Sequence, residues 1–172
     1  MAKKNIVLVG FMGSGKTMTA NKLAEILGSR VISTDQVIED REGRAITKIF
    51  EELGEAYFRK LEKDVIAEIT LQNGVILDCG GGAVLDQENI KNLRKNGLII
   101  YLSASPESIY ENIKDHSSRP LLNVEDPLKR IGELLGQRKL LYEQADIVID
   151  ADHRSIDQIT EDILKVLKNE KF

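Results

Sequence analysis

Short apolar runs recur along the chain, separated by longer segments whose apolar positions repeat every three to four residues. The apolar runs lie at residues 6–9, 31–32, 75–77, 98–102 and 147–149. The segments with helical spacing lie at residues 16–27, 55–71, 86–95, 106–114, 127–143 and 156–168. Continuous apolar runs are typical of parallel strands buried on both faces. The alternation therefore predicts an α/β fold, a five-stranded parallel sheet flanked by helices in three layers.

Glycine and proline mark several of the helix ends. Gly28 and Gly74 follow the first two helical segments, as glycine often does at a helix carboxyl end. Pro106 comes directly after Ser105, where a first helical turn tolerates its missing N–H. Residues 121–127 have no periodic pattern and are expected to form a loop. In such a fold, functional loops gather at the carboxyl ends of the strands.

A complete phosphate-binding motif follows the first apolar run. The GxxxxGK[ST] pattern is spelled by Gly10-Phe11-Met12-Gly13-Ser14-Gly15-Lys16-Thr17, between a predicted strand and a predicted helix. Its glycines let successive N–H groups point at phosphate oxygens, and the helix adds the positive end of its dipole. We expect a nucleoside triphosphate such as ATP to bind at Met12, Gly13, Ser14, Gly15, Lys16 and Thr17, in a loop that ATPases, GTPases, nucleoside monophosphate kinases and metabolite kinases share. Lys16 would reach the β- and γ-phosphates, and Thr17 would offer its hydroxyl to Mg²⁺. A plain glycine-rich turn is the alternative.

Composition narrows the class of protein. The chain has 172 residues, 42% of them hydrophobic, which suits a single domain over residues 1–172. A net charge of −4 without a long run of Lys or Arg argues against nucleic-acid and membrane partners. The only cysteine, Cys79, allows no intrachain disulfide, and the apolar run at 6–9 is too short for a signal peptide. We therefore expect a cytoplasmic protein, and a monomer because no long apolar stripe suggests an obligate interface.

Further motifs follow the phosphate loop in a fixed order. They are residues 33–39 (Ser-Thr-Asp-Gln-Val-Ile-Glu), 58–62 (Phe-Arg-Lys-Leu-Glu), 80–82 (Gly-Gly-Gly), 119–122 (Arg-Pro-Leu-Leu) and 138–142 (Arg-Lys-Leu-Leu-Tyr). In this order and spacing, the set resembles the shikimate kinases from the first strand to about residue 150. The resemblance implies a P-loop NTPase-type fold like that of nucleoside monophosphate kinases, with a mobile lid at about 114–126 and an acceptor-binding helical region at about 34–62.

The resemblance also implies roles in the acceptor site. Arg59 and Arg138 match carboxylate-binding arginines, and a planar guanidinium offers paired donors for that purpose. Asp35 matches the carboxylate that binds the substrate hydroxyls and orients or deprotonates the attacking one. Alternatives remain open, because Asp35 could serve only as a helix N-cap and arginines on helices are usually solvated surface residues.

The glycine loop and the lid complete the implied site. Gly80, Gly81 and Gly82 match a loop whose backbone comes close to the substrate and the transferred phosphoryl group, although a plain turn is the alternative. Arg119 matches a lid arginine that binds ATP and stabilises charge on the transferred group. The implied catalytic residues are thus Asp35, Lys16 and Arg119. Phe50 and Phe58 resemble the apolar walls of the acceptor pocket, or are simply core residues.

The chain departs from the family at the metal side of the site. Shikimate kinases usually carry Asp-x-Asp after the second strand, and the first of these acids helps to hold Mg²⁺; here that position is Ser33. Asp78, where the family has a small residue, could supply the missing acid from the adjacent strand, acting on the metal through water. The alternative is that Asp78 only caps the glycine loop by accepting backbone N–H groups.

The adenine side departs as well. Asn112 lies about where many family members have an arginine that stacks on adenine, so the base would be held by other groups, such as backbone near residues 152–154. His116 and His153 stand in no ligand-like cluster and are expected to be ordinary surface residues.

The predicted reaction is ATP plus shikimate giving ADP and shikimate 3-phosphate, with Mg²⁺ as cofactor. The chain has no Asn-Lys-x-Asp motif, which disfavours a guanine-specific switch. Two alternatives stay open: a P-loop kinase of another small hydroxy acid such as gluconate, and a catalytically inactive nucleotide-binding regulator. Turnover with each acceptor separates them.

Overall fold

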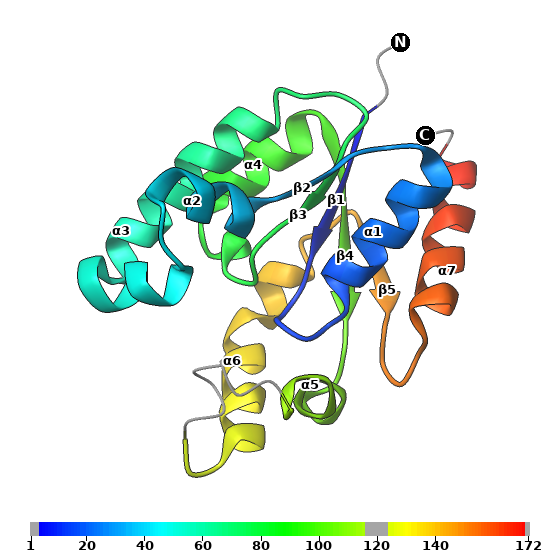
Figure 1. Ribbon diagram of the computed structural model, residues 1–172. Helices are drawn as coiled ribbons and strands as arrows, with labels where there is room; N and C mark the ends of the chain where they lie inside the picture. Colours follow the sequence, from blue (N-terminus) through cyan, green and yellow to red (C-terminus); the bar gives the residue numbers. More distant parts are fainter. Residues whose placement is uncertain (1–3, 116–123, 171–172) are drawn as a thin grey trace.

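The computed structural model describes residues 4–115 and 124–170. Its elements alternate between strands and helices along the chain (Figure 1). In order, they are β1 (Asn5–Val9), α1 (Lys16–Leu27), β2 (Val31–Ser33), α2 (Thr34–Glu42), α3 (Ile46–Ile69), β3 (Ile76–Asp78), the 3₁₀ helix η1 (Ala83–Leu85), α4 (Gln87–Lys95), β4 (Gly97–Ser103), α5 (Pro106–Ile113), α6 (Pro127–Tyr142), β5 (Ile147–Asp150) and α7 (Ile156–Asn169).

The strands form one parallel five-stranded sheet in the order β2-β3-β1-β4-β5. The predicted sheet is thereby confirmed. Because all five strands run in one direction, the loops that follow β1, β2 and β3 emerge at the same edge. The register pairs Asp78 of β3 with Ser33 of β2 on one side and with Leu8 of β1 on the other. The ends of these three strands therefore lie next to one another.

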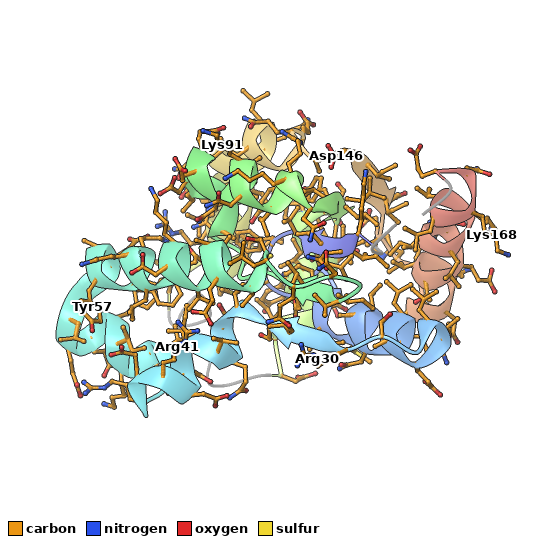
Figure 2. All side chains as sticks on the ribbon, turned by 90° about the horizontal axis from the view of Figure 1, so that it is seen from above. Arg30, Arg41, Tyr57, Lys91, Asp146 and Lys168 are labelled. Carbon is orange, nitrogen blue, oxygen red and sulfur yellow. The ribbon has the colours of Figure 1, made fainter. Side chains whose placement is uncertain are left out.

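Alternate residues of β1 point to two different cores. Val7 and Val9 belong to a core on the face covered by α3 and α4, whereas Ile6 and Leu8 belong to a core beneath α1 and α7. Figure 1 shows α1 and α7 on one side of the sheet and α3 and α4 on the other. This is the period of two expected of a strand buried on both faces. Charged side chains such as Lys91 and Lys168 lie at the periphery, whereas Arg41 lies between α2 and α3, where it pairs with Glu68 at 2.8 Å (Figure 2).

The structure extends one expectation about the elements and corrects another. The helix predicted over residues 55–71 is present as the second piece of α3, which ends at Ile69. A further helical piece that begins at Ile46 precedes it, and the two are joined at Gly54, whose φ of 81° and ψ of 169° are not helical. The strands were expected to be buried on both faces, but the edge strand β5 is not, because its Val148 is 52% exposed. Val148 is the register partner of Tyr101 but is part of neither hydrophobic core, so the face of the sheet meets solvent at this edge strand.

In the part of the chain that the structure describes, no helix combines the length and apolar character needed to cross a membrane.

Candidate active site

A cavity of about 640 Å³ opens at the carboxyl ends of β1, β2 and β3. Its lining comes from the phosphate loop, from the start of α2, from the glycine loop after β3 and from the loop after β5. Its polar side chains include those of Lys16, Thr17, Ser33, Asp35, Asp78, Asn112 and Arg154. The cavity thus lies at the sheet edge where α/β folds bind their ligands.

The phosphate loop is folded as an anion site. Gly13 and Gly15 have φ values of 78° and 89°, which residues with a Cβ rarely adopt. A Cβ at Gly13 would lie 2.6 Å from Ile113 Cγ2, so the loop packs closely on α5. The N-cap of α1 is Gly15, which has no side chain to cap the first amides of the helix, so these amides are suited to bind phosphate oxygens. Lys16 is buried, and its Nζ donates to the Phe11 carbonyl at 2.9 Å.

Thr17 and Asp78 lie in direct contact beside this loop. The Thr17 hydroxyl Oγ1 donates to Asp78 Oδ2 at 2.6 Å, and Asp78 is only 6% exposed. The alternative that Asp78 caps the glycine loop receives no support, because the Gly80 amide donates instead to Thr34 Oγ1 at 2.9 Å. Among the described residues, no three His, Cys, Asp or Glu side chains form a metal-binding group. Thr17 and Asp78 offer fewer oxygen ligands than the octahedral shell of Mg²⁺ takes, so a cation bound here would take its other ligands from water or from a nucleotide.

Asp35 faces the cavity from the first turn of α2. The N-cap of α2 is Ser33, whose side chain accepts the Gln36 amide, so the alternative that Asp35 is the N-cap is wrong. The Asp35 Oδ1 atom is buried and has no hydrogen-bond partner among the described residues. A Cβ at Gly80 would lie 2.5 Å from this oxygen. Burial raises the pKa of the Asp35 carboxyl, and the nearby Lys16 ammonium opposes that rise.

Arg59 is oriented by two acids of its own helix. Its Nη1 atom lies 2.8 Å from Glu62 Oε2, and its Nη2 atom lies 3.1 Å from Glu55 Oε1. Glu62 is 1% exposed, and burial raises the pKa of its carboxyl against the opposing effect of Arg59. A Cβ at Gly82 would collide with the Arg59 guanidinium, so this arginine lies directly against the glycine loop.

Helix α6 holds the glycine loop from the other side. Arg138 Nη1 donates to the Gly81 carbonyl at 3.4 Å, and the Tyr142 hydroxyl donates to the same carbonyl at 2.5 Å. Burial raises the pKa of Tyr142 to about 12, which keeps this hydroxyl protonated as a donor. The Arg138 guanidinium also lies 5.7 Å from the centre of the Phe11 ring. Arg59 and Arg138 are half-buried and meet at the glycine loop, so neither is an ordinary surface arginine.

Phe50 and Phe58 do not line the described cavity. Their ring centres are 4.7 Å apart, and Phe58 is buried in the core beneath α3. The Arg59 guanidinium lies 5.2 Å from the centre of the Phe58 ring. Phe58 is therefore a core residue, as the alternative interpretation had it, and its ring also packs against the Arg59 guanidinium.

The far end of the cavity lies between α5 and the loop after β5. Asn112 Nδ2 donates to the Gly13 carbonyl at 2.8 Å. Asn112, which replaces the adenine-stacking arginine of many family members, therefore links α5 to the phosphate loop. Asp152 accepts from the Ser105 amide and hydroxyl at the start of α5, and these bonds lower the pKa of Asp152 to about 2. His153 is 75% exposed, as expected of a surface residue. Arg154 lines the cavity and pairs with Asp162 at 2.7 Å.

Several predicted features fall on residues that the structure does not describe. Arg119 and His116 are among them, and so is most of the predicted lid at 114–126. Sequence analysis also left some functional side chains without a role: Thr34, which holds the Gly80 amide, Glu62 and Tyr142. For Glu62, its three-residue spacing from Arg59 on a buried stripe was the available signal.

Comparisons with known proteins agree with this geometry. The family model for shikimate kinase matches residues 12–168. A shikimate kinase of Caldanaerobacter subterraneus subsp. tengcongensis is 46% identical over 162 residues, which cover 94% of this chain and 95% of that protein. The solved structure of shikimate kinase from Acinetobacter baumannii in complex with shikimate has a TM-score of 0.93 and 34% identity, covering 99% of this chain and 96% of that one.

A gluconokinase from Sinorhizobium meliloti shares the fold alone, with a TM-score of 0.61 and 16% identity over 98% of this chain and 94% of that one. The match to the family model begins within the phosphate loop, at residue 12, and extends almost to the end of α7. The chain belongs to the shikimate kinase family.

Proposed function

We propose that this protein transfers the γ-phosphate of ATP to a hydroxyl of shikimate, with Mg²⁺, to give ADP and shikimate 3-phosphate. The observation that carries the proposal is the position of Asp35. Its buried, unpartnered oxygen lies beside Gly80, in the same cavity as the phosphate loop. A carboxylate in that place can accept the hydroxyl proton of an acceptor held in front of the γ-phosphate. Family membership and the shikimate complex of the Acinetobacter baumannii enzyme support the choice of acceptor.

The two arginines fit the other end of such an acceptor. Arg59 and Arg138 reach the glycine loop from α3 and α6, and both present guanidinium donors there. A carboxylate between them would be bound by paired, charge-assisted hydrogen bonds. Because Gly80 and Gly82 carry no Cβ, Asp35 and Arg59 can lie directly against the glycine loop and face an acceptor there. Asp35 and the arginines would thus fix opposite ends of shikimate and align one hydroxyl.

At the nucleotide, Lys16 and the amides of Met12 to Thr17 would bind the phosphates. The donor set of Thr17 and Asp78 fits a divalent cation, and a bound Mg²⁺ would supply charge neutralisation on the β- and γ-phosphates. Arg119 and a closing lid over residues 114–126 remain part of the proposal on the strength of the family resemblance. So do a single domain, a cytoplasmic location and a monomeric state, with neither nucleic acid nor membrane as partner.

ADP release by the purified protein, with ATP and Mg²⁺, tests the proposal. We expect release to depend on shikimate and to be far slower with gluconate or with no acceptor. Asp35→Asn should lower kcat by about 10²- to 10⁴-fold, the range of a lost general base. Asp40→Asn is the matched control, because Asp40 is an exposed acid on the same helix that bonds only Gln36 among the described residues.

Two results would contradict the proposal. Equal ADP release with gluconate and shikimate would indicate a kinase with broader acceptor use. Nucleotide binding without turnover on any acceptor would favour the inactive regulator.

A further inference from the structure

Positions 33 and 78 are direct neighbours at the edge of the sheet. Ser33 ends β2 and Asp78 ends β3, and the two residues are Cα partners across the parallel ladder. Both side chains line the cavity that contains the phosphate loop. A side chain at either position therefore approaches the same part of the nucleotide site.

The two side chains are used differently. The Ser33 hydroxyl binds the neighbouring helix, because it caps α2 by accepting the Gln36 amide. Asp78 is buried, and it is bonded to Thr17, the residue that follows the lysine of the phosphate loop. Asp78 also pairs with Leu8 of β1, the strand that leads into that loop. The ladder thus fixes the backbone of Asp78 beside the phosphate-binding segment, and the bond from Thr17 orients its carboxylate.

The bond between Thr17 and Asp78 orients the threonine for a cation. A hydroxyl has one donor hydrogen and two acceptor lone pairs. Because the Thr17 hydrogen points to Asp78 Oδ2 at 2.6 Å, the lone pairs of Oγ1 remain available to a metal ion. Mg²⁺ is usually held by one or two carboxylates together with phosphate oxygens and water, and by dedicated protein cages only rarely. The absence of a three-ligand group among the described residues fits that mode of binding.

We infer that Asp78 is the carboxylate that recruits the divalent cation of the bound nucleotide, through Thr17 and metal-bound water, and that an acid at position 33 could replace it. This inference uses the nucleotide half of the proposed function and is independent of the acceptor. The claim that an acid at position 33 could replace Asp78 follows from the pairing of β2 with β3, because this pairing makes Ser33 and Asp78 neighbours that line the same cavity.

The test measures Mn²⁺ affinity in the presence of saturating ADP, by electron paramagnetic resonance of free Mn²⁺, without any acceptor. Asp78→Asn keeps the shape of the side chain and an oxygen that can accept from Thr17, but removes the charge. We expect it to weaken Mn²⁺ binding by about 10- to 100-fold, the usual loss when a group supporting a metal ligand is changed. Affinity for ADP without metal should stay within about threefold of that of the unchanged protein.

The rescue variant is the sharper experiment. Ser33→Asp in the Asp78→Asn background should restore most of the lost Mn²⁺ affinity. The Asp40→Asn control should bind Mn²⁺ like the unchanged protein. Should Asp78→Asn fail to fold, the exchanged pair Ser33→Asp with Asp78→Ser tests the same point, and thermal unfolding identifies that case.

Two outcomes would overturn the inference. Unchanged Mn²⁺ affinity in Asp78→Asn would show that this acid does not serve the metal. Weakened binding that Ser33→Asp does not restore would show that the two positions are not interchangeable. Failure of the proposed function looks different: Mn²⁺ and ADP would bind as expected, but shikimate would not be phosphorylated.

Discussion

At the scale of single residues, the acceptor half of the site holds two carboxyl groups away from water. Asp35 Oδ1 and Glu62 Oε1 are both buried without a hydrogen-bond partner in the described part of the chain. Burial raises the pKa of each group, because removal from water penalises the ionised form. Groups kept at a cost to folding are typical of active sites. The site is therefore a place where function and stability oppose each other.

This opposition predicts that Asp35→Asn stabilises the fold while it lowers activity. Since the folded pKa of Asp35 is above its ordinary value of 3.8, the folded protein binds this proton more tightly than the unfolded chain does. The free energy of unfolding therefore falls as pH rises from about 4 through the folded pKa. Asp35→Asn should have a higher Tm at pH 7, by about 2–4 °C for each kcal/mol relieved. The difference should vanish near pH 3.5.

Thermal unfolding of both proteins at the two pH values checks this expectation. A lower Tm for Asp35→Asn at pH 7 would mean that Lys16 and Arg59 stabilise the ionised carboxylate by more than burial destabilises it. Asp40→Asn again serves as the control, with no pH-dependent change expected.

Gly82 is the second residue with a prediction of its own. A Cβ here would collide with the Arg59 guanidinium, so Gly82→Ala should displace that arginine. We expect KM for shikimate to rise about tenfold, equivalent to about 1.4 kcal/mol of lost binding, with a smaller change in KM for ATP. Gly136→Ala is the control, because a Cβ on this α6 glycine meets nothing within 4 Å. An unchanged KM for shikimate in Gly82→Ala would contradict the placement of Arg59.

The sequence named residues that the structure brings together. The phosphate loop follows from its motif, and Asp35, Arg59 and Arg138 from the family resemblance; all of them lie around one cavity or its glycine loop. Their roles in the reaction stay a prediction. Glu62 was missed because a charged residue on a helix is usually solvated. Only the three-dimensional packing shows that the stripe of α3 containing Phe58 and Val65 buries Glu62 as well.

At the scale of elements, α5 is tied at both ends to the nucleotide side of the molecule. Ser105 caps its first turn and bonds Asp152 of the loop after β5. Near its last turn, Asn112 bonds the Gly13 carbonyl. The helix thus fixes the phosphate loop relative to the end of β5.

Loss of that second bond should weaken nucleotide binding. A hydrogen bond of this kind contributes about 1 kcal/mol, so Asn112→Ala should raise KM for ATP about fivefold and leave KM for shikimate unchanged. Steady-state kinetics with each substrate varied in turn measures both constants. Glu111→Ala is the control, since Glu111 is an exposed neighbour that pairs with Lys114. Equal effects on the two KM values would show that Asn112 supports the fold in general.

Hydrophobic spacing predicted where the helices and strands lie, but it did not always predict where they begin and end. The first piece of α3 escaped prediction even though Ile46, Ile49 and Phe50 have helical spacing, because the segment is short and Gly54 ends it. The exposure of β5 could not be deduced from its apolar letters, since an edge strand and a central strand carry similar sequences here. Tertiary position decides both features.

At the scale of the whole molecule, the order of the strands in the sheet could not be predicted from the hydrophobic pattern. β1 pairs with β3 and β4, and these pairings join segments far apart in sequence. The expectation that the ends of β2 and β3 lie side by side is confirmed by the register of Ser33 with Asp78. This one neighbour relation turned two separate departures from the family into a single hypothesis about the metal.

The same topology predicts that the two ligands stabilise the molecule through separate residues. A ligand at 100 times its Kd adds about 2.7 kcal/mol to the free energy of unfolding, or about 5–11 °C in Tm for a chain of this size. At such concentrations, Lys16→Ala should lose the shift caused by ADP with Mg²⁺ but keep the one caused by shikimate. Arg138→Ala should show the reverse, because Arg138 contacts the glycine loop and Lys16 the phosphate loop. Loss of both shifts in either variant would mean that the two halves of the cavity form only together.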